Sequence, residues 1–140
     1  MFAVFGSRFT VIEMSIQRFE EIESWQMARE VCNTVFRLVG ECRNFSLKDQ
    51  MLRSSGSIMD NIAEGFDAGS NREFIRFLQY AKRSCSELQS QLYRCIDQKL
   101  ISQDEFDEHY SHIDLIKKKI GSFINYLSRN IDHRKVSDPR

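Results

Sequence analysis

The chain has 140 residues, and its 20 Lys+Arg balance its 20 Asp+Glu, so its formal net charge is zero. A hydrophobic content of 41% excludes a disordered chain and predicts one domain at this length. The single proline excludes collagenous and proline-rich classes and favours long helices, because proline is the strongest helix breaker. The neutral charge also excludes a uniformly basic nucleic-acid coat. Any contact with RNA or DNA must therefore depend on how the charges are arranged.

No apolar run approaches the roughly 18–20 residues that span a bilayer, so no membrane association is expected. The apolar residues 1–12 lack the basic start and cleavage site of a signal peptide. Met14 precedes the patterned region, which leaves either Met1 or Met14 as the start. The four cysteines show no Cys-x-x-Cys spacing, and we expect free thiols in a reducing cytoplasm. They are Cys32, Cys42, Cys85 and Cys95.

The first two amphipathic segments show the apolar spacing of three and four that is typical of helices. The first runs from Ala28 to Cys42 and has stop signals at Gly40 and Asn44. The second is predicted to start at a Ser46 cap and to end at Gly65.

The third segment has the clearest seam, three heptads of apolar residues that predict a helix packed in a bundle. The seam consists of Phe74, Leu78, Ala81, Cys85, Leu88, Leu92 and Cys95. A capping box is expected at its start, with Ser70 and Glu73 each bonding the other's backbone N–H. The fourth segment opens with a similar pair, Ser102 and Glu105, and continues to about Ile131.

Four long helices with short connections predict an all-α fold, an antiparallel up-down-up-down four-helix bundle. We expect residues 1–18 to be an N-terminal extension, residues 19–130 to form the bundle and residues 131–140 to be a polar tail.

The residue pattern offers little for catalysis or metal binding. Di-iron bundles need Glu-x-x-His on two helices, and this spacing does not occur in the cluster of Glu105, Glu108, His109 and His112. The cysteines lie on or beside apolar seams, where a buried thiol is usual. We therefore predict no cofactor, no small-molecule substrate and no enzymatic activity. One remote alternative is a HEPN-like ribonuclease, because Arg129 and His133 are similar to its Arg/His signature, although with three intervening residues instead of four to six.

A basic face is the strongest functional feature. Four arginines on the third helix, here called the arginine row, follow the period of the apolar seam about half a turn away. The arginine row consists of Arg72, Arg76, Arg83 and Arg94. Guanidinium groups suit phosphates because each can bond two oxygens. Two other interpretations remain open, a solvated face and a subunit contact. Arg29 and Arg37 on the first helix are secondary candidates for nucleic-acid binding.

The connection between the second and third helices is a candidate structural motif. Small residues at 54–57 predict a close approach of another backbone. Asn61 and Glu64 are expected to bond the backbone of the turn, with a polar site shared with Arg76 or Lys82 as the alternative. The motif consists of Ser57, Asn61, Glu64, Gly65, Ser70 and Glu73.

Several strings in the chain resemble the 23S rRNA intervening-sequence proteins. They are Trp25-Gln-Met-Ala-Arg29, Leu52-Arg-Ser-Ser-Gly-Ser-Ile58, Asn61-Ile-Ala-Glu-Gly-Phe66 and Ser70-Asn-Arg-Glu-Phe74. The Ser-Ile-x-x-Asn-Ile-Ala-Glu-Gly string is the most specific, and the match covers roughly residues 19 to 128.

The resemblance implies a four-helix bundle, usually a homopentamer, encoded in spacers of bacterial rRNA genes and without known enzymatic activity. It also implies a relation in fold to the accessory protein of diversity-generating retroelements, which binds a reverse transcriptase and nucleic acid through a basic surface. We therefore expect a self-associating bundle that binds RNA, or a nucleoprotein such as a reverse transcriptase, through the arginine row. The alternative is an assembly or adaptor protein with the row buried between subunits.

Overall fold

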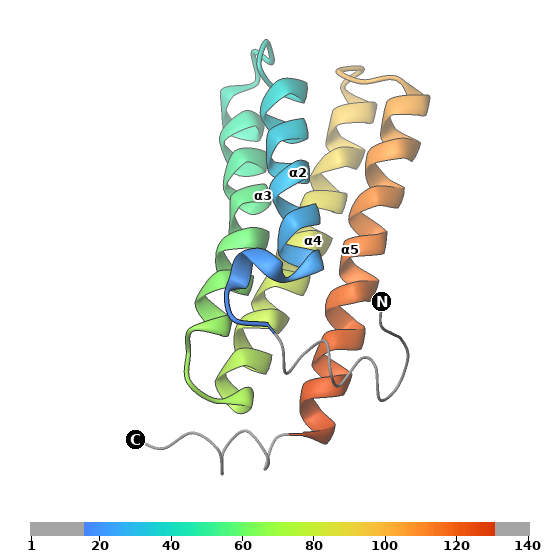
Figure 1. Ribbon diagram of the computed structural model, residues 1–140. Helices are drawn as coiled ribbons and strands as arrows, with labels where there is room; N and C mark the ends of the chain where they lie inside the picture. Colours follow the sequence, from blue (N-terminus) through green and yellow to red (C-terminus); the bar gives the residue numbers. More distant parts are fainter. Residues whose placement is uncertain (1–15, 131–140) are drawn as a thin grey trace.

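The computed structural model describes residues 16–130, and every regular element in this range is helical. The elements are η1 (Phe19–Glu21), α2 (Glu23–Leu38), α3 (Phe45–Phe66), α4 (Asn71–Asp97) and α5 (Gln103–Arg129). Figure 1 shows the chain running up α2, down α3, up α4 and down α5. The prediction of an all-α four-helix fold is therefore confirmed. Most of the predicted N-terminal extension, residues 1–15, lies outside the described residues, and so does the predicted tail, residues 131–140.

The core is built around α4, which packs against α3 on one side and α5 on the other. Every residue of its apolar seam is at most 2% exposed. Burying one large aliphatic or aromatic side chain contributes about 1.5–3 kcal/mol, so this seam is a major part of the stability. Because the seam of α4 faces the core, the opposite face of the helix is left to carry the arginine row.

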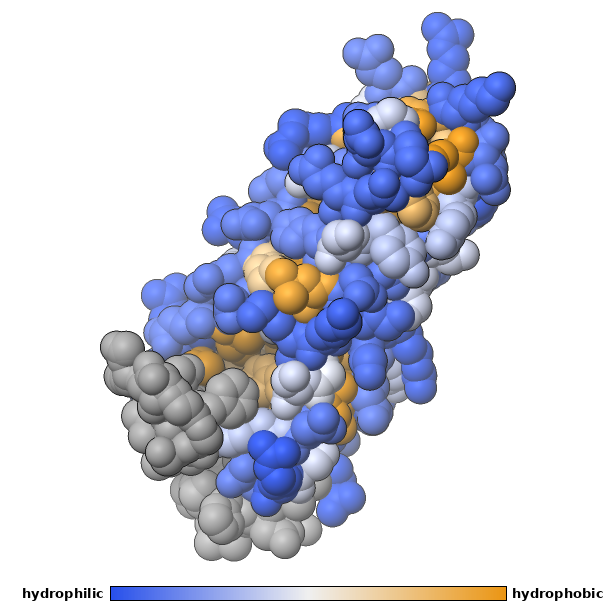
Figure 2. Space-filling model, turned by 90° about the vertical axis from the view of Figure 1, so that its right-hand side faces the viewer, coloured by the Kyte–Doolittle hydropathy of each residue, from blue (hydrophilic) through white to orange (hydrophobic). Residues whose placement is uncertain are grey.

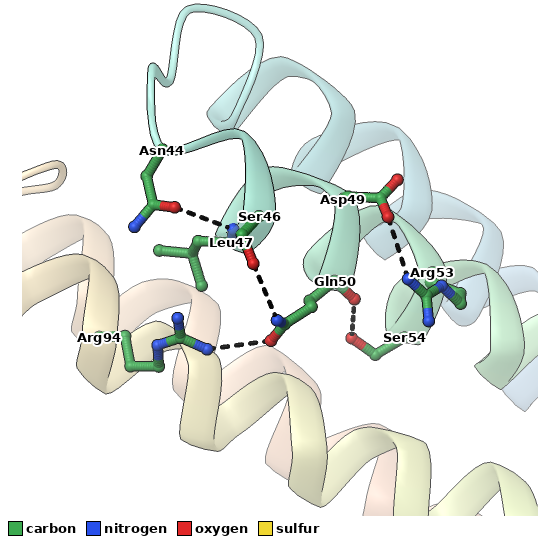
Figure 3. Close-up of polar contacts among 8 residues, drawn as sticks. All are labelled: Asn44, Ser46, Leu47, Asp49, Gln50, Arg53, Ser54 and Arg94. Carbon is green, nitrogen blue, oxygen red and sulfur yellow. Dashed lines mark hydrogen bonds and ion pairs between the residues drawn. The ribbon is translucent and has the colours of Figure 1, made fainter.

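The start of α3 differs from its prediction. The Ser46 cap is wrong, because the helix begins at Phe45 and Asn44 is its N-cap. Asn44 Oδ1 accepts a hydrogen bond from the backbone N–H of Leu47 at 3.1 Å (Figure 3). Its Nδ2 also donates to Gln98 Oε1 at 3.0 Å, which joins the two loops at this end of the bundle. Asn44 therefore starts the second helix rather than ending the first.

This geometry predicts that Asn44→Ala lowers the free energy of unfolding by about 1 kcal/mol, because the cap is lost. Ser46→Ala is the matched control. Ser46 is exposed and accepts only from Gln50 Nε2 in the described contacts, so its loss should change stability by less than about 0.5 kcal/mol. Urea unfolding followed by circular dichroism measures both. An equal effect of the two substitutions would contradict the assignment of the cap.

The predicted role of Gly65 is also corrected by the structure. It does not end α3 but lies inside the helix, buried, one residue before Phe66. A Cβ at Gly65 would lie 2.8 Å from Phe74 Cδ1 and 2.8 Å from Phe77 Cβ. The close approach of α3 and α4 is therefore here, and not at Gly56, where a Cβ would meet nothing within 4 Å.

The turn between α3 and α4 depends on a different glycine. Gly69 has a φ of 92°, a left-handed conformation that glycine adopts without a steric penalty. Ser70 then caps α4, its Oγ accepting from the N–H of Glu73 at 3.2 Å. The predicted return bond is replaced, because the Glu73 carboxylate accepts from Arg76 instead. The second predicted capping box, Ser102 with Glu105, is complete.

Two serines of α3 join it to α4 by hydrogen bonds. Ser54 Oγ donates to buried Gln91 Oε1 at 2.6 Å, and Ser84 Oγ donates to Ser57 Oγ at 2.8 Å. Asn61 Nδ2 donates back to the Ser57 carbonyl at 2.8 Å, so it does not bond the turn as predicted. Glu64 is exposed. The motif therefore sets how α3 and α4 pack together.

Candidate nucleic-acid interface

The arginine row lies on the outer face of α4, and all four of its side chains are exposed. The face is outward because its residues fall about half a turn from the buried seam. From Arg72 to Arg94 the row extends about 33 Å along the helix axis, at 1.5 Å per residue. This is a long, narrow basic surface.

Arg76 is the most engaged member of the row. Its Nη2 donates to Glu73 Oε1 at 2.9 Å and its Nη1 donates to the Tyr80 hydroxyl at 2.8 Å. The hydrogen bond to Glu73, followed by that to Tyr80, raises the pKa of the Arg76 guanidinium. The ion pair is half exposed, so solvent screens it and it contributes little to stability. A phosphate must therefore compete with Glu73 for Arg76.

Arg83 and Arg94 have neutral partners. The Arg83 guanidinium lies 5.7 Å from the centroid of the Tyr80 ring. Arg94 Nη1 donates to Gln50 Oε1 at 2.9 Å, and Gln50 in turn donates to Ser46 on α3 (Figure 3). Among residues 16–130, no carboxylate forms an ion pair with Arg72, Arg83 or Arg94. Their charge is uncompensated by contact ion pairs.

The secondary candidates are not part of this face. Arg29 and Arg37 are exposed on α2, with the Arg29 guanidinium 5.9 Å from the Trp25 ring centroid. Helices α2 and α4 occupy opposite corners of the bundle, each packed between α3 and α5 (Figure 1). The two α2 arginines and the arginine row therefore cannot contact one continuous flat surface.

Two lysines that the sequence did not assign to the site extend it toward α5. Lys82 of α4 and Lys117 of α5 line a hollow of about 320 Å³ together with Gln79, Arg83 and Ser86. Lys82 directly follows seam residue Ala81, and Lys117 directly follows buried Ile116. Their positions at the flanks of two seams are the sequence signal that could have paired them. Lys82 does not form the predicted alternative site with Asn61 and Glu64, since it faces α5.

Two of the four cysteines are poor candidates for a nucleophile. Cys85 and Cys95 are buried, and burial raises the pKa of Cys85 to about 12 and that of Cys95 to about 11. All four cysteines are free thiols. Arg129 is exposed at the end of α5, while His133 of the ribonuclease alternative lies outside the described residues.

Residues 16–130 contain neither a metal-binding cluster nor a membrane-spanning helix. Between residues 16 and 130, no group of three or more His, Cys, Asp or Glu side chains could hold a metal ion. No helix in the same range is long and apolar enough to cross a membrane.

The fold and the exposed arginines define a class, a four-helix bundle with a basic outer face. A family model described as the 23S rRNA-intervening sequence protein matches residues 20–122, and the chain belongs to this family. The structure is also similar to the 1.70 Å crystal structure of a protein of unknown function from the S23 ribosomal protein family of Bacteroides thetaiotaomicron. That similarity has a TM-score of 0.65 at 29% identity, covering 73% of this chain and 91% of the other. Curated proteins yield no match. The resemblance expected from the sequence is confirmed, and neither description names an enzymatic activity.

Proposed function

We propose that this protein is a non-enzymatic, self-associating helical bundle that binds RNA through the arginine row. The observation that carries the proposal is the exposure of four arginines on one outward helix face, three of them without a carboxylate partner in the described range. An arginine in an ion pair must give up its partner before it binds a phosphate. Arg72, Arg83 and Arg94 form no such ion pair in the described residues, so a phosphate does not have to displace a carboxylate from them.

Self-association would strengthen RNA binding by the arginine row. One bundle offers few phosphate contacts, but several bundles on one strand raise the effective concentration of each further contact. Phe36 and Phe45, which border the loop between α2 and α3, are 68% and 72% exposed. Exposed aromatic side chains are common at protein interfaces. These exposed rings and the pentamer implied by the family resemblance support the binding of a second copy of this chain at this end of the bundle.

The test combines mass and salt dependence. Light scattering of the purified chain should give a mass several times that of one chain. Fluorescence anisotropy with a single-stranded RNA should show log Kobs falling by about 0.7 per phosphate contact for each unit of log salt, or about 2 for three arginines. An affinity that does not change between about 50 and 300 mM salt would contradict phosphate binding.

A specific observation favours the second candidate, an assembly or adaptor protein with the row between subunits. The Arg76 guanidinium lies 5.2 Å from the Phe77 ring centroid and 5.5 Å from that of Tyr80. Arginine and tyrosine are enriched in protein interfaces, where such stacked pairs are often buried. A nucleoprotein partner, such as a reverse transcriptase, would use the same surface. Under this hypothesis, charge reversal in the row should dissociate the oligomer or the partner complex.

A further inference from the structure

The hollow between α4 and α5 brings three positive charges together from two helices. Gln79, Lys82, Arg83 and Ser86 share one flank of α4, and Lys117 faces them from α5. The hollow measures about 320 Å³ and lies on the side of the bundle toward α5. Figure 2 shows the right-hand side of the view in Figure 1, where α5 lies, and its surface is mostly hydrophilic with separate hydrophobic patches.

The two lysines are directed into this region by the packing of the helices. Lys82 Nζ lies against α5, 3.7 Å from where a Cβ on Gly121 would be. Lys117 is one helical turn before Gly121, and its Nζ donates to Gln89 Oε1 on α4 at 3.4 Å. Each lysine therefore reaches toward the neighbouring helix, Lys117 partly buried and Lys82 exposed.

The hollow has no acidic lining residue. Within the part of the chain that the structure describes, no carboxylate forms an ion pair with Lys82, Arg83 or Lys117. Asp114, one turn before Lys117, accepts from Lys118 at 3.3 Å and from Gln89 at 3.4 Å, and its charge also interacts with Lys117 at longer range. The neutral lining groups, an amide and a hydroxyl, can both donate hydrogen bonds. The hollow is thus chemically complementary to an anion.

From this arrangement we infer that the hollow binds a terminal phosphate monoester, the end of an RNA strand whose backbone follows the arginine row. The assignment of RNA as the source rests on the proposed function. A monoester carries close to two negative charges at neutral pH, whereas an internal phosphodiester carries one, and Coulomb attraction to three cations grows with that charge. The lining has no aromatic ring on which a base could stack, so the phosphate is the recognised group.

The experiment compares RNAs of one sequence with a 5′-phosphate, a 3′-phosphate or hydroxyl groups at both ends. Anisotropy should show at least one phosphorylated RNA binding about tenfold more tightly than the hydroxyl-ended RNA, the effect of one additional charge-assisted contact. Lys117→Gln should reduce this ratio to below about threefold, and Lys117→Arg should preserve it. Lys118→Gln is the matched control, because Lys118 pairs with Asp114 outside the hollow and should leave the ratio unchanged.

Inorganic phosphate provides a test that is independent of RNA. It should shift the backbone amide NMR signals of Gln79 and Ser86 in the wild type, and not in Lys117→Gln. RNA binding with equal affinity for all three ends would overturn this inference and leave the proposed function standing. Phosphate-induced shifts without binding of any RNA would support the hollow as a free-phosphate site and overturn the proposed function. Absence of both responses would overturn both.

Discussion

Gly65→Ala is expected to destabilise the bundle by about 1–3 kcal/mol, the usual effect of forcing an additional methyl group into a close-packed core. The new Cβ would lie 2.8 Å from Phe74 Cδ1 and from Phe77 Cβ. Phe74 cannot easily move, because its ring also packs edge-on against Phe123 of α5 with centroids 5.1 Å apart. Helices α3 and α4 would have to separate, which would weaken the contact around which the core is built.

Gly56→Ala is the matched control for this substitution. Gly56 lies in the same helix, but a Cβ there would meet nothing within 4 Å. Alanine is the better helix former, so this change should stabilise the protein by about 0.5–1 kcal/mol. Thermal and urea unfolding of both variants would measure the difference. Two changes of the same sign would contradict the assignment of Gly65 as the point of close approach.

Reversing two charges with Arg72→Glu and Arg83→Glu is expected to lower RNA affinity about a hundredfold. Each charge-assisted contact contributes about 1.5–3 kcal/mol, and two lost contacts amount to roughly 3 kcal/mol. These two arginines are chosen because Arg76 is paired with Glu73 and Arg94 is bonded to Gln50. Both targets are exposed, so the fold should tolerate the change. Anisotropy at fixed salt measures the affinity.

The matched control is Arg29→Glu with Arg37→Glu, the same change of charge at the opposite corner of the bundle. It should lower affinity by less than about fivefold, which reflects only the altered net charge. Light scattering must accompany both measurements. If the α4 variant loses its oligomeric mass, the row lies between subunits and the assembly hypothesis is favoured. Equal losses of affinity in both variants would show that binding is not confined to α4.

Periodicity explains why so much of the fold could be predicted. The seam from Phe74 to Cys95 places its members on one side of a helix whatever else is present, because every residue turns the chain by about 100°. The same rotation places the arginine row on the opposite side. Pairs such as Ser102 with Glu105 are local too, since the cap and its partner are three residues apart.

The errors concern contacts between residues that are distant in sequence, or choices between neighbouring candidates. Asn44 and Ser46 are both good N-cap residues, and only the structure shows that Asn44 is the cap, bonded to the Leu47 N–H and also to the distant Gln98. Glycine serves helix ends as well as close packing, and only the position of Phe74 shows which role Gly65 has. Arg76 and Glu73 are only three residues apart, but the Glu73 carboxylate could also have bonded the Ser70 N–H. Spacing alone therefore did not show which of the two bonds forms.

The sequence by itself determined four amphipathic helices, their buried seams and an outward row of arginines, because each of these follows from the rotation of one helix about its own axis. Only the tertiary structure decided that Lys82 and Lys117 line one hollow with Arg83. That convergence depends on the axial offset and the rotation of α5 relative to α4, which are set by how two sets of side chains interlock. No single helix encodes that relation.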